Sequence, residues 1–193
     1  MNFVRFSPRL AACSVALAAA LGGVGFAANP ASAATYPSCL DANRQVASGP
    51  GSVIQWYCND SDNYQNWTVI RVGQEHSGSG PEIPLYVIKN NQTSQCLDAD
   101  AQQAYPGGAV IQWPCDYGSF DGYVMWIRTQ TPEGYSFQNA GATYQGGALC
   151  LDANAQQTYN FGKIIQWPCQ ASDPFQNWFV QTTDHDVLQN VGA

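Results

Sequence analysis

The stretch CLDADAQQAYPGGAVIQWPC, residues 96–115, occurs three times in the chain in closely similar form. Its counterparts are CLDANRQVASGPGSVIQWYC at residues 39–58 and CLDANAQQTYNFGKIIQWPC at residues 150–169. The three copies are each 20 residues long, align without a gap and share ten identical positions. Self-similarity at a regular spacing indicates a repeat architecture, so we expect a fold made of three equivalent units.

A cysteine opens and closes each copy. Of the seven cysteines only Cys13 lies outside the copies, and the others are Cys39, Cys58, Cys96, Cys115, Cys150 and Cys169. An even number of cysteines in an exported chain indicates disulfides. Because the spacing is the same in every copy, a pairing between copies breaks the threefold symmetry. The sequence therefore predicts one disulfide within each copy, and closing a loop of this size contributes about 3 kcal/mol.

The segments between the copies have the character of short strands. Apolar and aromatic runs such as Trp67–Val72 and Trp126–Arg128 are bounded by Gly, Asn, Asp, Ser and Pro. No stretch after residue 33 keeps a helical period of 3.6 residues without Gly or Pro. This pattern predicts an all-β protein.

The number and length of the repeats restrict the architecture. A propeller needs about four or more blades, and a solenoid needs capped ends. Here the copies recur three times, at intervals of 54 to 57 residues. Three such units, each with several short strands, suit a closed threefold barrel that leaves no open sheet edge.

The C-terminus is predicted to complete this barrel. Strand-like phrases precede the second and third copies, at Leu85–Asn90 and Tyr135–Asn139, whereas only residues 34–38 precede the first. A matching phrase, Asp186–Asn190, stands at the other end of the chain. We therefore expect this tail to supply the strand that the first copy lacks.

Residues 1–33 have the pattern of a secretory signal peptide. Arg5 and Arg9 precede an apolar run at Leu10–Ala28, and Ala31-Ser32-Ala33 supplies a small-residue cleavage pattern. The alternative is a membrane anchor, because the run approaches the length that spans a bilayer. Gly22, Gly23 and Gly25 interrupt it. We therefore expect a secreted, extracellular protein, with one domain at residues 34–193.

The charge of residues 34–193 limits the partners. Once the two leader arginines are removed, five of the seven basic residues and all 14 acidic residues remain, a net charge of −9. Nucleic acid and anionic membranes are disfavoured because no basic patch is available to hold them. Gln, Asn, Tyr and Trp are plentiful, so the surface suits uncharged, hydroxyl-rich partners such as sugars.

Three features of the repeats carry a family resemblance. They are the Leu-Asp after the first cysteine, the Gln-Trp before the second, and the later Gln-x-Trp at residues 65–67 and 176–178. Together they resemble the ricin-B-type lectin repeat, which is also grouped among the carbohydrate-binding modules attached to bacterial glycosidases. The resemblance covers essentially all of residues 34–193. It implies a β-trefoil fold and glycan binding, without a cofactor or a metal.

The resemblance assigns the main sugar ligand to Asp41, Asp98 and Asp152. An ionised carboxylate can accept hydrogen bonds from two adjacent sugar hydroxyls. Alternatively, each aspartate caps its own turn through backbone N–H groups. Repetition does not separate these interpretations, because a structural role would repeat as well.

The tryptophans fall into two sets. Trp56, Trp113 and Trp167 match the family position that stacks on a pyranose ring, although strand alternation also places Trp56 on the same side as Cys58, against the disulfide. The later residues Trp67, Trp126 and Trp178 are expected in the barrel core.

The residues before the later tryptophans bear on sugar type. Gln65 and Gln176 match the family glutamine that supports the aspartate, and Val124 replaces it in the second copy. The family's galactose-binding copies usually carry Asn one position earlier, where this chain has Tyr64, Tyr123 and Phe175. A tyrosine there resembles mannose-binding actinohivin-type trefoils. Those trefoils carry a further Tyr where this chain has Ile54, Ile111 and Ile165. The glycan is therefore galactose-type, mannose-type or a polysaccharide.

Catalytic patterns are not found in the sequence. The three glutamates and two histidines lie outside the copies, and no HExxH, GxSxG, phosphate-binding loop or metal-ligand spacing is present. We therefore expect a lectin rather than an enzyme. The alternative is a trefoil scaffold with decayed sugar sites that binds a protein, in the manner of a protease inhibitor.

The polar residues rank the three copies as sugar sites. The first copy keeps Asp41, Trp56, Asn59, Tyr64 and Gln65. The third keeps Asp152, Trp167 and Gln176, and the second keeps Asp98, Trp113 and Tyr123 but has Val124. Because a lost buried hydrogen bond weakens a site, we expect the first copy to bind best and the second least.

Overall fold

The computed structural model describes residues 37–76, 80–116, 121–182 and 186–193. All of them belong to one compact unit, Ala34–Ala193. The predicted signal peptide lies outside the described residues. No helix in the described ranges is long and apolar enough to cross a bilayer.

Six strands form a closed antiparallel ring. They are β3 (Trp67–His76), β4 (Glu82–Asn90), β7 (Trp126–Thr131), β8 (Gly134–Tyr144), β12 (Trp178–Thr182) and β13 (Asp186–Asn190). In the ring β3 pairs with β4, β4 with β7, β7 with β8, β8 with β12, β12 with β13, and β13 returns to β3. Closure removes open sheet edges from the barrel. The predicted all-β barrel is therefore confirmed.

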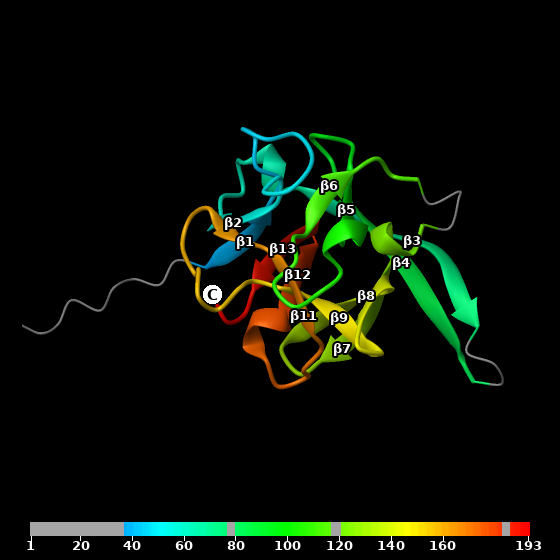
Figure 1. Cartoon of the computed structure of the whole chain (residues 1–193). Helices are drawn as coiled ribbons and strands as arrows, with labels where there is room; N and C mark the ends of the chain where they lie inside the picture. The colour runs from blue at the N-terminus through cyan, green and yellow to red at the C-terminus, as the bar shows by residue number, and fades with distance from the viewer. Residues whose placement is uncertain (1–36, 77–79, 117–120, 183–185) are drawn as a thin grey trace, which may run out of the picture. The chain divides into compact units, whose positions relative to one another are not determined.

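Each copy of the repeat forms a hairpin attached to this barrel. The hairpins are β1 (Ser38–Asp41) with β2 (Ile54–Tyr57), β5 (Cys96–Asp98) with β6 (Ile111–Trp113), and β9 (Gly147–Asp152) with β11 (Ile165–Pro168). The short β10 (Gly162–Lys163) pairs with β2. Three hairpins on a six-stranded barrel make a β-trefoil (Figure 1).

The disulfides lie within the copies, as predicted. They join Cys39 to Cys58, Cys96 to Cys115, and Cys150 to Cys169, each with a Cα–Cα distance of 5.0 Å. The described residues also contain four short 3-10 helices: η1 (Asn63–Gln65), η2 (Ala101–Gln103), η3 (Gly122–Val124) and η4 (Pro174–Gln176). Each of η1, η3 and η4 begins after an aspartate whose side chain accepts a backbone N–H within the helix.

The later tryptophans fill the barrel, as predicted. Trp67, Trp126 and Trp178 are fully buried. Their indole N–H groups donate to the carbonyls of Leu40, Leu97 and Leu151, over 3.0, 3.0 and 3.2 Å. A buried indole keeps its hydrogen bond in this way while its rings pack in the core.

The C-terminal strand closes the first copy, as predicted. Gln189 of β13 is paired with Cys39 of β1. The equivalent pairs in the other copies are Lys89 with Cys96 and Gln138 with Cys150. In Figure 1 the red β13 accordingly lies beside the blue β1 at the start of the domain. Strands from both ends of the domain therefore complete one unit.

An asparagine on each of the strands β4, β8 and β13 fixes the neighbouring 3-10 turn. Asn90 Nδ2 donates to the carbonyls of Tyr64 and Asn66, over 2.8 and 3.2 Å. Asn139 and Asn190 make the same pair of bonds in the second and third copies. The three asparagines are buried. The same local structure is thus built three times.

The glutamine of the shared Ile-Gln-Trp joins each copy to the next one around the axis. Gln112 Nε2 donates to the carbonyls of Ala42 and Ser52 in the first copy, over 3.0 and 2.8 Å. Gln166 likewise reaches the second copy and Gln55 the third, so the contacts close a circle. All three glutamines are buried. The sequence marks these positions as identical, but only the packing shows that their bonds cross between copies.

The glycine that all copies share has a steric role in two of them. A Cβ at Gly108 would overlap the carbonyl oxygen of Gln103, and one at Gly162 would overlap that of Gln157. These loops are the ones that meet the neighbouring hairpin, with Gly162 paired to Gln55. A larger residue would therefore disturb the contact between copies.

We predict that Gln112→Ala lowers the free energy of unfolding by about 2 kcal/mol, because two buried carbonyls lose their donor. Urea unfolding followed by tryptophan fluorescence measures the change. Gln181→Ala, at an exposed position of β12, is the matched control and should shift stability by less than about 0.5 kcal/mol. Equal stabilities of the two variants would show that the circle of glutamines is not a stabilising contact.

Candidate functional site

The predicted aspartate and tryptophan ligands lie on the same hairpin in each copy. Asp41 ends β1 and Trp56 lies on β2, with Cys39 paired to Trp56 and Asp41 paired to Ile54. Asp98 and Trp113, and Asp152 and Trp167, hold the same places on the other hairpins. The aspartates are buried, whereas Trp113 is 49% exposed and Trp167 39% exposed. Trp113 and Trp167 are therefore accessible at the surface, whereas Trp56 is half-buried and lies opposite Cys39.

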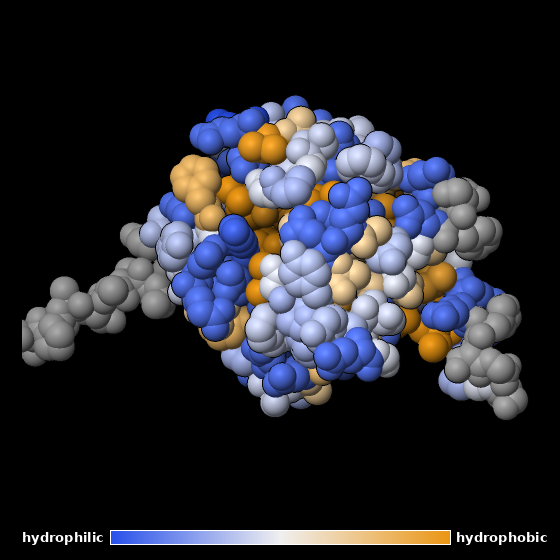
Figure 2. Space-filling model, viewed as in Figure 1, coloured by the Kyte–Doolittle hydropathy of each residue, from blue (hydrophilic) through white to orange (hydrophobic). Residues whose placement is uncertain are grey.

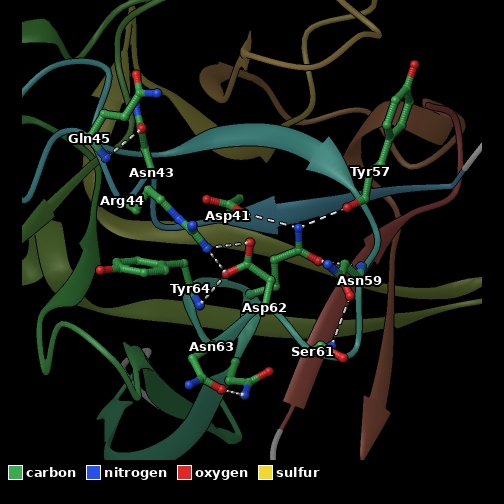
Figure 3. Close-up of polar contacts among 12 residues, drawn as sticks. Asp41, Asn43, Arg44, Gln45, Tyr57, Asn59, Ser61, Asp62, Asn63 and Tyr64 are labelled. Atoms are coloured by element: carbon green, nitrogen blue, oxygen red, sulfur yellow. Dashed lines mark hydrogen bonds and ion pairs between the residues drawn. The ribbon is translucent and has the colours of Figure 1, made fainter.

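A glutamine amide holds the aspartate in the first copy. Gln65 is fully buried, and its Nε2 donates to Asp41 Oδ2 over 3.1 Å and to the Tyr57 carbonyl over 3.0 Å. Its Oε1 accepts the Asn59 backbone N–H over 2.9 Å. Figure 3 labels the three partners of this amide, Asp41, Tyr57 and Asn59. The amide is therefore fixed at both ends, and it orients the carboxylate.

The third copy repeats this arrangement. Gln176 Nε2 donates to Asp152 Oδ2 over 3.1 Å and to the Pro168 carbonyl over 3.1 Å. Gln176 Oε1 accepts the Gln170 N–H over 2.8 Å. Asp152 Oδ1 also accepts the Asn154 N–H over 2.7 Å, which is the turn-capping contact. Turn capping and ligand binding are compatible here, because a carboxylate has about four acceptor sites.

The second copy lacks the supporting amide. Val124 occupies the position of the glutamine and is fully buried. Within the described part of the chain, no side chain donates a hydrogen bond to Asp98. Burial, followed by the carboxylates of Asp121 and Asp100, raises the pKa of Asp98 to about 7 from an ordinary 3.8. This carboxyl therefore titrates near neutral pH.

The other two carboxyls are buried but supported. Burial raises the pKa of Asp41 and of Asp152 above the ordinary value of 3.8. The hydrogen bonds from Gln65 and Gln176 act in the opposite direction, because they favour the charged form. An acceptor that stays ionised at lower pH is available to sugar hydroxyls over a wider pH range.

A hollow of about 220 Å³ opens over Asp41 in the first copy. Its lining includes Trp56, and also Phe161 from the third copy, whose ring lies edge-on to Trp56 at 4.4 Å between centroids. Three of the predicted residues, Asn59, Tyr64 and Gln65, lie outside this lining. Asn59 accepts the Ser61 N–H with its side chain, and Tyr64 packs against the core and under Arg44. Asn59 thus contributes through its backbone bond to Gln65.

A larger hollow, about 440 Å³, opens over Asp98 in the second copy. The predicted residues Trp113 and Tyr123 both line it, together with Asp100 and Asp121. Despite these carboxylates, the described residues contain no group of three or more His, Cys, Asp or Glu side chains arranged to hold a metal ion. The hollow is therefore an acidic, partly aromatic surface that suits hydroxyl donors.

Each site takes one wall from a neighbouring copy. Phe161 of the third copy lines the first hollow, and Pro50 of the first copy lines the second. Gly107 of the second copy faces Trp167, since a Cβ there would lie 4.0 Å from that indole. Phe161, Pro50 and Gly107 occupy the same position in the three aligned copies. Sequence analysis missed them, because nothing local shows which copy packs beside which.

The outer surface agrees with a ligand that is bound in shallow recesses. Figure 2 shows hydrophilic residues over most of one face, with apolar residues visible largely in the recesses between them. One buried carboxylate beside an aromatic ring can accept hydroxyl hydrogens and contact the C–H face of a pyranose. Fold and sites together define a β-trefoil with a buried carboxylate and a tryptophan on each of its hairpins.

Comparison with known families agrees with this class. Residues 84–192 match the ricin-type beta-trefoil lectin domain, and residues 31–113 match the ricin-type beta-trefoil lectin domain-like family. The chain therefore belongs to the ricin-type β-trefoil lectin family and is a carbohydrate-binding β-trefoil. None of the curated proteins matches its sequence significantly.

Solved structures support the fold. ThreeFoil, a designed 3-fold symmetric protein, is similar with a TM-score of 0.57 and 20% identity, over 76% of this chain and 91% of that chain. An exo-β-1,3-galactanase from Clostridium thermocellum is similar with a TM-score of 0.54 and 18% identity, over 81% of this chain and 30% of the galactanase chain. At such identities the likeness concerns the fold alone.

Proposed function

We propose that this chain is a secreted, non-catalytic lectin with up to three shallow sugar sites, one on each hairpin. Sites of this kind bind weakly one at a time and more strongly together on a surface that displays many glycans. The sugar is galactose-type, mannose-type or part of a polysaccharide. Nucleic acids and membrane insertion are not part of the proposed function.

One observation carries the proposal. In two copies a fully buried or nearly buried glutamine amide, Gln65 or Gln176, donates to a carboxylate oxygen over 3.1 Å. In the first copy this carboxylate, Asp41, lines an open hollow together with Trp56. Purely structural turn capping needs the carboxylate and the backbone N–H, but it does not need a second, buried amide or an exposed indole.

Three further features support the proposal. Disulfides persist in oxidising compartments, and each of the three copies in this chain contains one. The leader-like residues 1–33 favour export. In the first and third copies a carboxylate that a glutamine holds lies on the same hairpin as an indole, which suits the binding of sugar hydroxyls.

Residues 34–193, applied to a glycan array, test the proposed function. We expect binding to a defined set of terminal sugars that is competed by the free monosaccharide. Galactosides and mannosides are the first probes, and β-1,3-linked galactans are included because one structural neighbour is an exo-β-1,3-galactanase. Absence of binding to every glycan, with specific binding to a protein such as a protease, would replace the lectin by the protein-binding alternative.

Single substitutions test the assignment of the sites. We expect Asp41→Ala to reduce sugar affinity most, Asp152→Ala next and Asp98→Ala least, because only the first two carboxylates are held by a glutamine. A lost buried hydrogen-bond partner costs roughly 1–3 kcal/mol, which is enough to silence a weak site. Calorimetry on variants shown to be folded measures the affinities. The assignment is wrong if Asp98→Ala has the largest effect or if no variant differs from the wild type.

A further inference from the structure

The first two hollows have diverged in size although their sequences are repeats. The hollow over Asp41 measures about 220 Å³ and the one over Asp98 about 440 Å³. Their linings share the aspartate, the isoleucine that follows in β2 or β6, the tryptophan and the aspartate before the 3-10 helix. The difference must therefore come from the positions at which the copies differ.

One such position is Arg44 in the first copy, which aligns with Ala101 in the second and Ala155 in the third. Arg44 Nη2 lies 3.4 Å from Asp62 Oδ2 and 3.5 Å from Oδ1. Its guanidinium carbon lies 5.4 Å from the centre of the Tyr64 ring. Figure 3 shows this side chain reaching to the Asp62 carboxylate across the Tyr64 ring.

In the second copy, the residues that correspond to these two partners of Arg44 face the hollow. Asp121 and Tyr123 correspond to Asp62 and Tyr64, and both line the larger hollow. In the first copy Tyr64 is absent from the lining, whereas Arg44 is part of it. Arg44 thus occupies the space between the 3-10 turn and the aspartate that Ala101 leaves free.

We propose that Arg44 is a specificity-determining residue, which restricts the first site to a single sugar unit, whereas the second site accommodates two consecutive units. The proposal rests on the proposed lectin function. A hollow twice as large, with Tyr123 in its wall beside the 3-10 turn, offers contacts to a second ring at a position that Arg44 occupies in the first site. Phe161 also lines the first hollow and not the second. It contacts Trp56, however, and not Asp62 or Tyr64, which are the residues that Arg44 contacts.

The contacts of Arg44 set the size of the expected effect. Its side chain is 65% exposed, and exposed ion pairs and cation–π contacts are individually weak. A second sugar unit can therefore displace Arg44 at a modest cost. We expect a discrimination of about three- to tenfold in affinity rather than complete exclusion.

Reciprocal exchange of the two residues tests the proposal. The first site is isolated by Asp98→Ala with Asp152→Ala, and the second by Asp41→Ala with Asp152→Ala. Each is titrated by calorimetry at pH 8.5, where Asp98 is ionised, with galactose and β-1,3-galactobiose and with mannose and α-1,2-mannobiose. The quantity compared is the ratio of the disaccharide affinity to the monosaccharide affinity.

Arg44→Ala should raise this ratio at the first site about three- to tenfold and leave the monosaccharide affinity nearly unchanged. Ala101→Arg should lower the ratio at the second site by a similar factor. Arg71→Ala is the matched control, because it removes the same charge from an exposed position of β3 that lines neither hollow. Melting temperatures establish that each variant is folded. If one of the two variants does not fold, the affinity ratio of the other variant tests the proposal.

The outcomes separate this proposal from the proposed function. If Arg44→Ala changes both affinities equally, or neither, Arg44 does not set ligand size, and the lectin function stands. An increase in both affinities that Arg71→Ala reproduces would assign the effect to net charge and would also overturn the proposal. If the wild-type chain binds none of these sugars and no glycan on the array, the lectin function fails and this inference fails with it.

Discussion

A chain that ends after Thr183 is expected not to fold at 25 °C, although it keeps all three copies of the repeat and all three disulfides. The truncation removes β13, which pairs with β12 along its whole length and also with β1 and β3. Circular dichroism in the near ultraviolet and thermal unfolding measure the result. An unchanged melting temperature would count decisively against the barrel closure described here.

The size of the expected loss of stability follows from the contacts that β13 makes. Leu188 is fully buried in the main core, and removal of a buried leucine side chain alone costs about 3–5 kcal/mol. Asn190 donates to the carbonyls of Phe175 and Asn177, and Asp186 Oδ2 accepts the Val69 N–H over 2.8 Å. With β3 and β12 left as open edges, the loss exceeds the net stability of a typical domain, roughly 5–15 kcal/mol.

Two controls make the truncation specific. Removal of only Gly192 and Ala193 leaves β13 intact and should lower the melting temperature by a few degrees at most. Leu188→Ala should give an intermediate loss, since the backbone pairs of β13 remain. If the short deletion is as damaging as the long one, the effect comes from the chain end and not from the strand.

Asp98→Asn is expected to stabilise the protein at pH 8 by roughly 2–4 kcal/mol and to change its stability little at pH 4. The carboxyl of Asp98 is buried without a supporting amide, and its pKa is raised to about 7. Burying a charge without a partner is costly, whereas burying a neutral amide of the same shape costs less. Urea unfolding at a series of pH values measures the difference between the two proteins.

The direction in which stability changes with pH follows from proton binding to Asp98. Because the pKa of Asp98 is higher in the folded chain than the ordinary 3.8, the folded state holds the proton more tightly than the unfolded state. The stability of the wild type is therefore highest below about pH 4 as far as Asp98 is concerned. It falls as the pH rises toward 7 and levels off above that value. The asparagine variant lacks this loss.

Asp152→Asn is the matched control. Gln176 and the Asn154 N–H both favour the charged form of Asp152, so the gain on substitution at pH 8 should be smaller than at Asp98. Val124→Gln is the complementary variant, because it restores the amide of the other copies and should flatten the pH dependence. Equal gains at positions 98 and 152 would show that the missing amide is not the cause.

Much of the fold could be predicted from the sequence because the repeats encode it locally. Equal cysteine spacing predicted the disulfides, and the phrase Asp186–Asn190 predicted the strand that closes the first copy. Both predictions are confirmed. The placement of Asp41 and Trp56 on adjacent strands of one hairpin could also be predicted, since residues close in sequence on adjacent strands stay close in space.

The hydrogen bonds from Gln65 and Gln176 to the aspartates could be predicted for a different reason. Gln65 and Gln176 lie the same distance beyond Asp41 and Asp152 in the sequence, and the family resemblance assigned them a supporting role. The structure adds the two hydrogen bonds by which each glutamine is held. Val124 was the basis for the prediction that the second copy binds least. The pKa of Asp98 near 7 follows from burial and from Asp121 and Asp100, which only the packing brings together.

The sequence by itself thus determined the threefold repeat, the disulfides, the core tryptophans and one carboxylate and indole for each site. The tertiary structure alone decided which copy supplies the wall of each site and how large each hollow is. Phe161 reaches Trp56 across more than 100 positions of the sequence, and Gln112 binds carbonyls of another copy. Repeat patterns report the contacts inside a unit, which are the same in every copy. The contacts between units depend on the circular order in which the closed barrel places them, and no local pattern carries that order.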